Sequence, residues 1–287
     1  MKVCGFSFVR NAIKYGYPVV ESIKSILPVC DQFIILVGNS DDETIDLIRS
    51  INSDKIRIIE SVWDESLKTG GAVLAVETNK AIDNIAQDFD WCFYLQADEV
   101  VHEKYLPTIF EEMKLWNGNP HIDGLLFKYL HFWGNYDYIA TSRQWYRREI
   151  RIIRNDKNIR SYRDAQGFRK NDQKLRVKLI DAFIYHYGWV KNPSIMYQKL
   201  NNFGKLWNGD DYELHKENQV IDYSETDTIC RFRETHPSVM TDRIKNLNWH
   251  TELDKQRYKT SLRDKVLNFY ENVTGYRLFE YKNYKII

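Results

Sequence analysis

The 287-residue sequence has no apolar run long enough to cross a membrane. Its longest uninterrupted apolar segments, such as 33–37 (FIILV) and 72–76 (AVLAV), contain five residues, whereas a bilayer-spanning helix needs about 20. The first twelve residues, MKVCGFSFVRNA, also lack the apolar core of a secretory signal peptide. These absences argue against a membrane-spanning or secreted protein and predict a cytoplasmic one.

Cysteine is scarce, and its spacing argues against a disulfide framework or a zinc site. The four cysteines are scattered and form no CxxC pair: Cys4, Cys30, Cys92 and Cys230. Structural zinc sites and disulfide-bonded small domains normally show closely spaced cysteines. We therefore expect small buried thiols in a protein from a reducing compartment.

The chain also lacks a net charge, because 41 basic side chains almost balance 40 acidic ones. This balance argues against nucleic acid as a partner, since binding its phosphates requires a surplus of cations. Charge is nevertheless uneven along the chain, and residues 143–178 hold 13 basic and 4 acidic side chains. A solvated basic strand pair and a surface for phosphates are both compatible with this segment.

The first 130 residues alternate between apolar strand patterns and amphipathic helix patterns. Apolar segments typical of buried strands lie at 2–9, 33–37, 56–61 and 91–95. Helical patterns lie between them, at 19–27, 43–51 and 72–87. This alternation predicts the α/β class, with a mainly parallel central sheet and helices on both faces.

The alternation breaks after residue 124. Strand-like segments follow at 124–134, 148–154 and 178–188, and a helical pattern covers 195–207. From about residue 208 the chain is more polar, and its last 45 residues predict one or two helices and a tail. We therefore expect a main domain over 1–207, divided at about residue 130, and a mostly helical extension over 208–287.

The most informative segment is YLQADEVV (94–101), where a buried strand ends in adjacent carboxylates. Ligands of parallel sheets bind beyond the carboxyl ends of the strands. Two carboxylates there repel each other and lose hydration unless a cation compensates them. Mg²⁺ or Mn²⁺ characteristically joins such oxygens to substrate phosphates. Asp98 and Glu99 therefore indicate a divalent-cation site, or alternatively a helix cap beside an exposed glutamate.

Four motifs together resemble the family 2 glycosyltransferases of GT-A fold over about the first 130 residues. They are MKVCGFSFVRNA, the GNSDDET turn, the Gly70-Gly71 loop followed by Asn79-Lys80, and YLQADEVVHE. The resemblance implies an inverting hexosyltransferase of polysaccharide biosynthesis. Such an enzyme moves a sugar from a nucleotide diphosphate donor, by default a UDP-sugar, to a glycan or lipid-linked acceptor. Residues 1–130 would form its nucleotide-sugar half and residues 131–207 its acceptor half.

The family holds Mg²⁺ or Mn²⁺ with an Asp-x-Asp motif after the fourth strand. In this chain Gln96 stands at the first position and Asp98 at the second, so the resemblance assigns the metal to Asp98, with help from Glu99. Proteins of this fold often add a late histidine, a ligand that suits these metals, and this points to His186. A core histidine among aromatic side chains is the alternative for that residue.

The resemblance assigns the nucleotide to residues that follow the first strands. The residues in the position that receives the base are Phe8, Arg10 and Asn11. Asp41 or Asp42 matches the acid that contacts the base or ribose, and Lys80 lies where a basic residue approaches the diphosphate. Helix capping by the two aspartates and simple exposure of Lys80 are the alternatives.

Inverting sugar transfer needs a base that removes the proton of the acceptor hydroxyl. Asp164, in the segment RDAQGF, has the position along the chain that the resemblance implies for this base, and Glu149 and Asp181 are its rivals. The neighbouring cations Arg163 and Arg169 predict a lowered pKa for Asp164.

Residues 255–287 carry 8 basic and 3 acidic side chains interleaved with aromatics. A sugar platform, a peripheral contact with the inner face of an anionic membrane, and packing on the main domain are all compatible with this basic tail.

Two other functions share parts of this pattern. A nucleotidyltransferase has a similar acidic sheet edge, but it would show a Gly-rich basic loop after the first strand, which FSFVRNAIKYGYP does not contain. A non-catalytic carbohydrate- or nucleotide-binding protein derived from a glycosyltransferase is the second alternative, because Gln96 offers a metal only a neutral oxygen.

Overall fold

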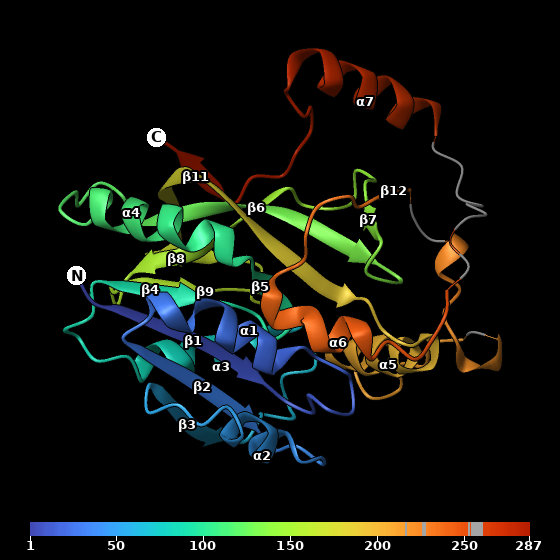
Figure 1. Ribbon diagram of the computed structural model, residues 1–287, viewed down its shortest axis with the longest axis horizontal. Coiled ribbons are helices and arrows are strands. Elements are labelled where there is room, and N and C mark those ends of the chain that lie inside the picture. Colours follow the sequence, from blue (N-terminus) through green and yellow to red (C-terminus); the bar gives the residue numbers. More distant parts are fainter. Residues whose placement is uncertain (216, 226–227, 252, 254–260) are drawn as a thin grey trace.

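The computed structural model describes residues 1–215, 217–225, 228–251, 253 and 261–287. Its central sheet follows the order β3 (Ile56–Ser61), β2 (Gln32–Gly38), β1 (Val3–Val9), β4 (Trp91–Tyr94), β8 (Arg148–Arg154), β6 (Gly124–Trp133) and β11 (Gln173–Trp189) (Figure 1). β8 is antiparallel to both β4 and β6, and every other neighbouring pair on this path is parallel. Six of the seven strands therefore run in one direction, and the predicted mainly parallel sheet is confirmed.

Helices cover both faces of the parallel half of the sheet. They are α1 (Val19–Ile26), α2 (Thr44–Arg49), α3 (Ala72–Asp83) and α4 (Leu106–Trp116). Ile23, Ile48 and Met113 bring α1, α2 and α4 onto one face, and Ala81 and Ile82 of α3 pack on the opposite face. β1, β2 and β4 are almost wholly apolar because both of their faces are buried, whereas the edge strand β3 exposes Arg57 and Glu60.

Six short strands extend the central sheet: β5 (Glu99–Val101), β7 (Tyr138–Ala140), β9 (Ile159–Ser161), β10 (Phe168–Lys170), β12 (Ile229–Arg231) and β13 (Tyr284–Ile286). β5 pairs with β11 in antiparallel register, with His186 opposite Glu99. This pairing places the end of β11 directly beside the turn that follows β4, and it is the feature of the fold that assembles the site.

The chain after β11 contains helices and short strands. α5 (Pro193–Asn208) begins at Asn192, whose side chain accepts a hydrogen bond from the amide of Ser194. α6 (Thr241–Lys245) and α7 (Leu262–Thr274) follow, and α7 lies apart from the sheet (Figure 1). β12 then pairs with β7, and β13 pairs with β11. Residues 255–260 of the predicted basic tail lie outside the described residues.

The structure also bears on the cysteines and on membrane-spanning helices. Three cysteines are buried as expected, whereas Cys230 is exposed, because β12 pairs only with the short strand β7 at the edge of the fold. In the part of the chain that the structure describes, none of the helices combines the length and the apolar character needed to cross a bilayer.

Candidate functional site

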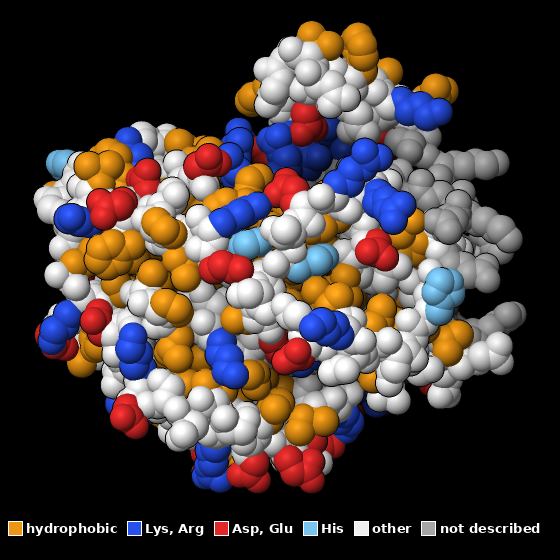
Figure 2. Space-filling model, in the orientation of Figure 1, with side chains coloured by type: hydrophobic (Ala, Val, Ile, Leu, Met, Phe, Trp, Pro, Cys, Tyr) orange, Lys and Arg blue, Asp and Glu red, His pale blue; other side chains and the backbone are white. Residues whose placement is uncertain are grey.

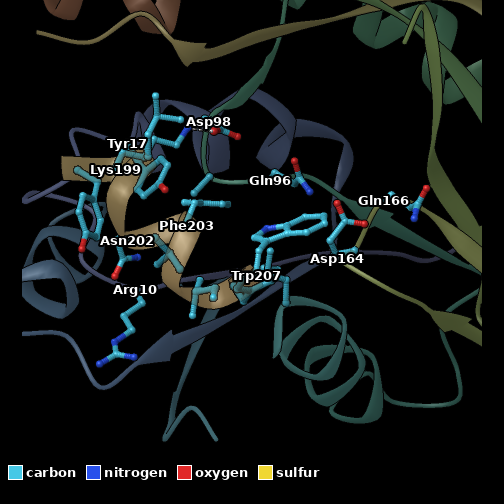
Figure 3. A pocket seen from close by; sticks show the side chains of 18 of the residues that line it. Arg10, Tyr17, Gln96, Asp98, Asp164, Gln166, Lys199, Asn202, Phe203 and Trp207 are labelled. Carbon is cyan, nitrogen blue, oxygen red and sulfur yellow. Dashed lines mark hydrogen bonds and ion pairs between the residues drawn. The ribbon is translucent and has the colours of Figure 1, made fainter. Parts of the chain in front are cut away.

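A cavity of about 610 Å³ opens at the carboxyl ends of β1 and β4. The turns after these strands form one side, and α5, the segment between β9 and β10 and residues 281–284 form the other (Figure 3). Most of the residues singled out by the sequence line it: Phe8, Arg10, Asn11, Asp41, Gln96, Asp98, Asp164 and His186. Side chains from five distant parts of the chain thus meet where a parallel sheet normally binds its ligand.

Asp42 and Lys80 do not line this cavity. Asp42 accepts hydrogen bonds from the amides of Thr44 (3.1 Å) and Lys14 (2.8 Å), so it fixes the turn that leads into α2, whose N-cap residue is Glu43. The ammonium of Lys80 lies 2.6 Å from Oε1 of Glu77 within α3. Both side chains are therefore engaged in local structure.

Glu99 also lies outside the cavity lining, and it is fully buried. Arg151 of β8 donates to both of its carboxylate oxygens at 2.7 Å. The hydroxyl of Tyr129 donates to Oε1 at 2.8 Å, and the amide of Gln96 donates to Oε2 at 3.1 Å. These four bonds occupy both oxygens, so Glu99 holds the turn over residues 96–99 and is not the exposed glutamate of the alternative interpretation.

Asp98 and His186 meet inside the cavity. Oδ1 of Asp98 lies 3.8 Å from Nε2 of His186, as the pairing of β5 with β11 dictates. Gly188 keeps the space between them open, because a Cβ atom there would lie 2.5 Å from His186 Nε2 and 2.7 Å from Asp98 Oδ2. A side chain at position 188 would therefore fill the space that these two groups face.

A second histidine fixes which nitrogen of His186 faces Asp98. Nε2 of His131 lies 2.7 Å from the carbonyl oxygen of Tyr146, which can only accept, so this nitrogen carries hydrogen. Burial lowers the pKa of both histidines, which favours neutral rings. Nδ1 of His131 then accepts from Nδ1 of His186 at 2.9 Å. Nε2 of His186 is left with a free lone pair on the side of Asp98.

This donor set fits a divalent cation. Two acceptors face each other across the space beside Gly188, and the hydrogen bond from His186 to His131 holds the ring of His186 in place, as outer hydrogen bonds do in many metal sites. Within the described residues, no three His, Cys, Asp or Glu side chains gather as metal ligands. A cation here would thus have Asp98 and His186 as its protein ligands and would take further oxygens from substrate phosphate and water.

Lys199 of α5 contacts the other oxygen of Asp98 and was not predicted from the sequence. Its ammonium lies 3.3 Å from Asp98 Oδ2 and donates to the carbonyl of Gly188 at 2.9 Å. Nζ of a second buried lysine, Lys191, lies 4.5 Å from the ring centroid of Tyr17, and Nζ of Lys199 lies 5.2 Å from the same centroid. Burial lowers the pKa of Lys191. Burial acts to raise the pKa of Asp98, but this positive charge, chiefly that of Lys199, holds it at about 2.

The sequence did carry a signal for Lys199. Met196, Leu200 and Phe203 mark one apolar stripe of α5 at helical spacing, and Lys199 falls on the same stripe. A lysine in such a position must find a buried partner or a ligand. Figure 3 shows Lys199 and Phe203 projecting from α5 into the cavity.

Asp164 lies in the cavity wall beside Trp207 of α5 (Figure 3). Gly71, with φ of +69°, lets both approach closely, since a Cβ atom there would lie 3.0 Å from Asp164 Cβ and 3.2 Å from the indole ring of Trp207. The expectation of a lowered pKa for Asp164 is wrong. Burial raises this pKa and outweighs the opposing charge of Arg163.

The two rivals of Asp164 differ in their placement. Glu149 lines the cavity, and burial raises its pKa to about 7. The side-chain amide of Asn283 donates to its two oxygens at 3.1 and 3.2 Å. Asp181 is exposed, lies outside the cavity lining and pairs with Lys128 at 2.7 Å.

Aromatic side chains form the corner of the cavity at the end of β1. The rings of Phe8 and Trp63 lie 5.9 Å apart, and the guanidinium of Arg10 lies 5.5 Å from the Trp63 centroid. The side chain of Asn11 accepts from the amide of Asp41 at 2.9 Å and so fixes the next turn. Flat rings with an adjacent guanidinium suit a planar aromatic ligand.

Several cations of the basic segment 143–178 are neutralised within the protein. Arg143 and Arg147 bind Glu271 of α7 at 2.7 and 2.9 Å, and Lys170 binds Asp123 at 3.2 Å. The segment therefore helps to attach the C-terminal region to the sheet. Its cations that line the cavity are Arg148 and Arg151.

Neither a scan against protein-family models nor a search of curated proteins finds a match to this sequence. Among solved structures, it resembles S. aureus TarS, residues 1–349, at 12% identity and a TM-score of 0.38, over 74% of this chain and 67% of that chain. The structure of that protein in complex with UDP gives the same values.

Two further solved structures are similar to a smaller part of the chain. One is glucosyl-3-phosphoglycerate synthase from Mycobacterium tuberculosis with Mn²⁺, UDP and phosphoglyceric acid, at 14% identity and a TM-score of 0.32, over 45% of this chain and 43% of that chain. The other is 4-diphosphocytidyl-2C-methyl-D-erythritol synthase from Anaerococcus prevotii, at 8% identity and a TM-score of 0.35, over 54% and 70%. All of these identities are below 25%, and all of these TM-scores are below 0.5.

Proposed function

We propose that this chain is an inverting glycosyltransferase that moves a sugar from a nucleotide diphosphate donor, for which UDP is our default, to a glycan or lipid-linked acceptor. The observation that carries the proposal is the meeting of Asp98 and His186 in the cavity at the carboxyl ends of β1 and β4. The site lies where parallel sheets bind nucleotides, and the cavity volume is that of a small-molecule pocket.

The donor nucleotide would lie along the side formed by the strand ends. Its base fits the corner of Phe8, Trp63 and Arg10, where it can stack on a ring and meet a guanidinium. Asp41 lines the same corner and can accept hydrogen bonds from ribose hydroxyls. The diphosphate would then extend toward Asp98 and Lys199.

Asp98 and His186 would hold Mg²⁺ or Mn²⁺, which supplies positive charge to the diphosphate leaving group when it is bound. Lys199 supplies further positive charge from the protein. Its ammonium is already fixed by Asp98 and by the carbonyl of Gly188, so it needs little rearrangement as negative charge develops on the leaving group.

Asp164 is the general base of this proposal. Burial raises its pKa, and a carboxylate with a raised pKa accepts a proton more readily. The rival Glu149 already receives two hydrogen bonds from Asn283. Gly71 and Trp207 hold Asp164 in the wall, so an acceptor hydroxyl that enters the cavity can reach it.

The replacement Asp98→Asn tests this function most directly. Wild type should show a rise in melting temperature with UDP-sugars that depends on Mn²⁺, because a ligand specific to the native state stabilises it. The variant should lose this dependence, and donor hydrolysis should fall at least about 100-fold, since metal charge stabilisation is worth several kcal/mol. Thermal shift and a coupled assay for released UDP measure the two effects.

Asp181→Asn is the matched control, because it removes an exposed carboxylate that lies outside the cavity lining. It should behave as wild type in both measurements. If no nucleotide sugar raises the melting temperature of wild type, with or without Mn²⁺ or Mg²⁺, the proposal is rejected. Binding without any turnover would instead favour the non-catalytic binding protein.

A further inference from the structure

Helix α7 lies on the protein through its polar side. Glu271 accepts from Arg143, Arg147 and Arg277 at 2.7 to 2.9 Å, and Arg143 also donates to the carbonyl of Leu278 at 2.7 Å. No residue of α7 is buried. The contacts that fix this helix are therefore ionic, whereas an ordinary surface helix turns its apolar side inward.

The opposite side of α7 is apolar and open to solvent. Leu262, Val266, Phe269 and Val273 follow one another at steps of four, three and four residues, which places them on one face of the helix. Their side chains are 81%, 67%, 72% and 69% exposed. Figure 2 shows hydrophobic side chains along this outer edge. We call these four residues the outer face of α7.

Within α7, two cations stand beside the outer face, and the two carboxylates of the helix do not. Arg263 and Lys265 are exposed and lie on either flank of the face. The two acidic residues of the helix, Asp264 and Glu271, are partly covered and lie on its other side. The surface that α7 presents outward is therefore apolar with a basic border.

We propose that the outer face of α7 docks onto an anionic lipid surface. Amphipathic helices that lie in a membrane interface combine an exposed apolar face with flanking lysine or arginine, whose charges meet anionic headgroups. The C-terminal membrane contact expected from the sequence is thus assigned to a particular helix face, and the apolar side chains contribute together with the basic charge.

A second copy of the chain fits this face less well. A helix of 13 residues is about 20 Å long and about 10 Å wide, so its face covers roughly 200 Å², against about 800 Å² per partner in a standard stable interface. A parallel pairing of two such faces would also bring Arg263 and Lys265 of both copies together, and these like charges would repel each other.

The position of α7 connects this surface with the proposed reaction, and this step rests on the proposed function. The chain that follows the helix lines the cavity at Tyr281, Asn283 and Tyr284. Docking of α7 would therefore hold the cavity near the membrane surface. A lipid-linked acceptor could then present its sugar to Asp164 while its lipid stays in the membrane.

Vesicle flotation tests the docking surface. Wild type should float with vesicles of phosphatidylcholine and phosphatidylglycerol, and much less with phosphatidylcholine alone. Phe269→Asp combined with Val273→Asp should reduce the floated fraction at least about tenfold, because charge replaces the inserted apolar area. Arg263→Gln with Lys265→Gln should reduce flotation with the anionic vesicles and weaken its dependence on salt.

The matched control is Leu115→Asp, which changes an equally exposed apolar side chain on α4 and should float as wild type. Flotation that is absent in wild type, or unchanged by the α7 variants, would overturn the proposal. So would a wild-type dimer in light scattering that Phe269→Asp converts to monomer, since the partner would then be a second copy.

Binding of UDP-sugars without vesicles separates this proposal from the proposed function. The α7 variants should keep wild-type donor binding, because α7 does not line the cavity. If flotation fails while donor binding persists, the docking surface alone is rejected. If flotation occurs but no donor binds, the surface stands and the proposed function is rejected.

Discussion

The two sides of the cavity combine apolar and polar contacts in different proportions. The side at the ends of β1 and β4 rests on parallel strand pairing and on fully buried side chains such as Phe6 and Tyr94. The other side, formed by α5 and residues 281–284, combines apolar packing, as at Met196 and Tyr284, with polar contacts between distant positions. Examples are Lys199 with Asp98, 101 positions apart, and Asn283 with Glu149, 134 positions apart.

Because of this difference, the strand side mainly determines the shape of the site, whereas charged and polar groups of the outer side make its stability depend on pH and salt. Apolar burial is insensitive to pH and to salt over the ordinary range, so the strand side keeps its shape whenever the sheet forms. The outer side depends on groups whose protonation and pairing can change. Variants on the two sides should therefore differ in size of effect and in dependence on pH.

The largest expected effect lies beneath the strand side, where Arg151 pairs with Glu99. Arg151→Met should lower the free energy of unfolding by about 3–5 kcal/mol, because it leaves a buried carboxylate without its cation. Urea denaturation measures this loss. Adding Glu99→Gln should recover part of it, since the double variant buries no charge at this pair.

Arg49→Met is the comparison for this prediction, because it breaks an ion pair with Asp46 that is exposed on both sides. Solvent screens such pairs, and the loss should be much smaller. Equal losses for Arg49→Met and Arg151→Met would show that the buried pair does not stabilise the turn over residues 96–99.

The next largest effect concerns Glu149, at the junction of the two sides. Burial raises its pKa to about 7 from the usual 4.5, so the folded state binds this proton more tightly than the unfolded state. The resulting stabilisation is fully present below about pH 4.5 and is lost as the pH rises to about 7. A shift of this size corresponds to about 3 kcal/mol.

Glu149→Gln should remove this dependence, because glutamine does not titrate. Relative to the variant, wild type should lose about 3 kcal/mol of stability between pH 4 and pH 8. Chemical denaturation of both proteins at several pH values measures the difference. Parallel stability profiles would mean that Glu149 titrates normally and that burial does not raise its pKa.

The strand side could largely be predicted from the sequence because its signals are local. Apolar runs mark the strands, and in a parallel sheet the residues after each strand come to one edge. Asp98 and Asp41 reach the cavity in this way. The same reasoning could not separate Asp98 from Glu99, since one side chain enters the cavity and the next is bound to Arg151.

The sequence patterns do not show which strands become neighbours in the sheet. β8 lies beside β4 because it returns antiparallel to β6 and fills the position between β4 and β6, and no local pattern fixes that order. The approach of Lys199 to Asp98 and of Asn283 to Glu149 depends in the same way on tertiary packing. For Lys80 and Asp42 the resemblance implied donor contacts, whereas their side chains bind within α3 and at the start of α2.

The smallest expected effect lies on the outer side, at Asn283. Asn283→Ala removes the hydrogen bonds to Glu149 and to the carbonyl of Gln166, and it should lower the free energy of unfolding by about 1–2 kcal/mol. Binding of UDP-sugars with Mn²⁺ should persist, because Asp98 and His186 do not contact this residue. Asn272→Ala, exposed on α7, is the control and should change neither quantity. If Asn283→Ala instead abolished Mn²⁺-dependent binding as completely as Asp98→Asn, the two sides of the cavity would act as one unit. The proposed difference between the two sides would then be wrong.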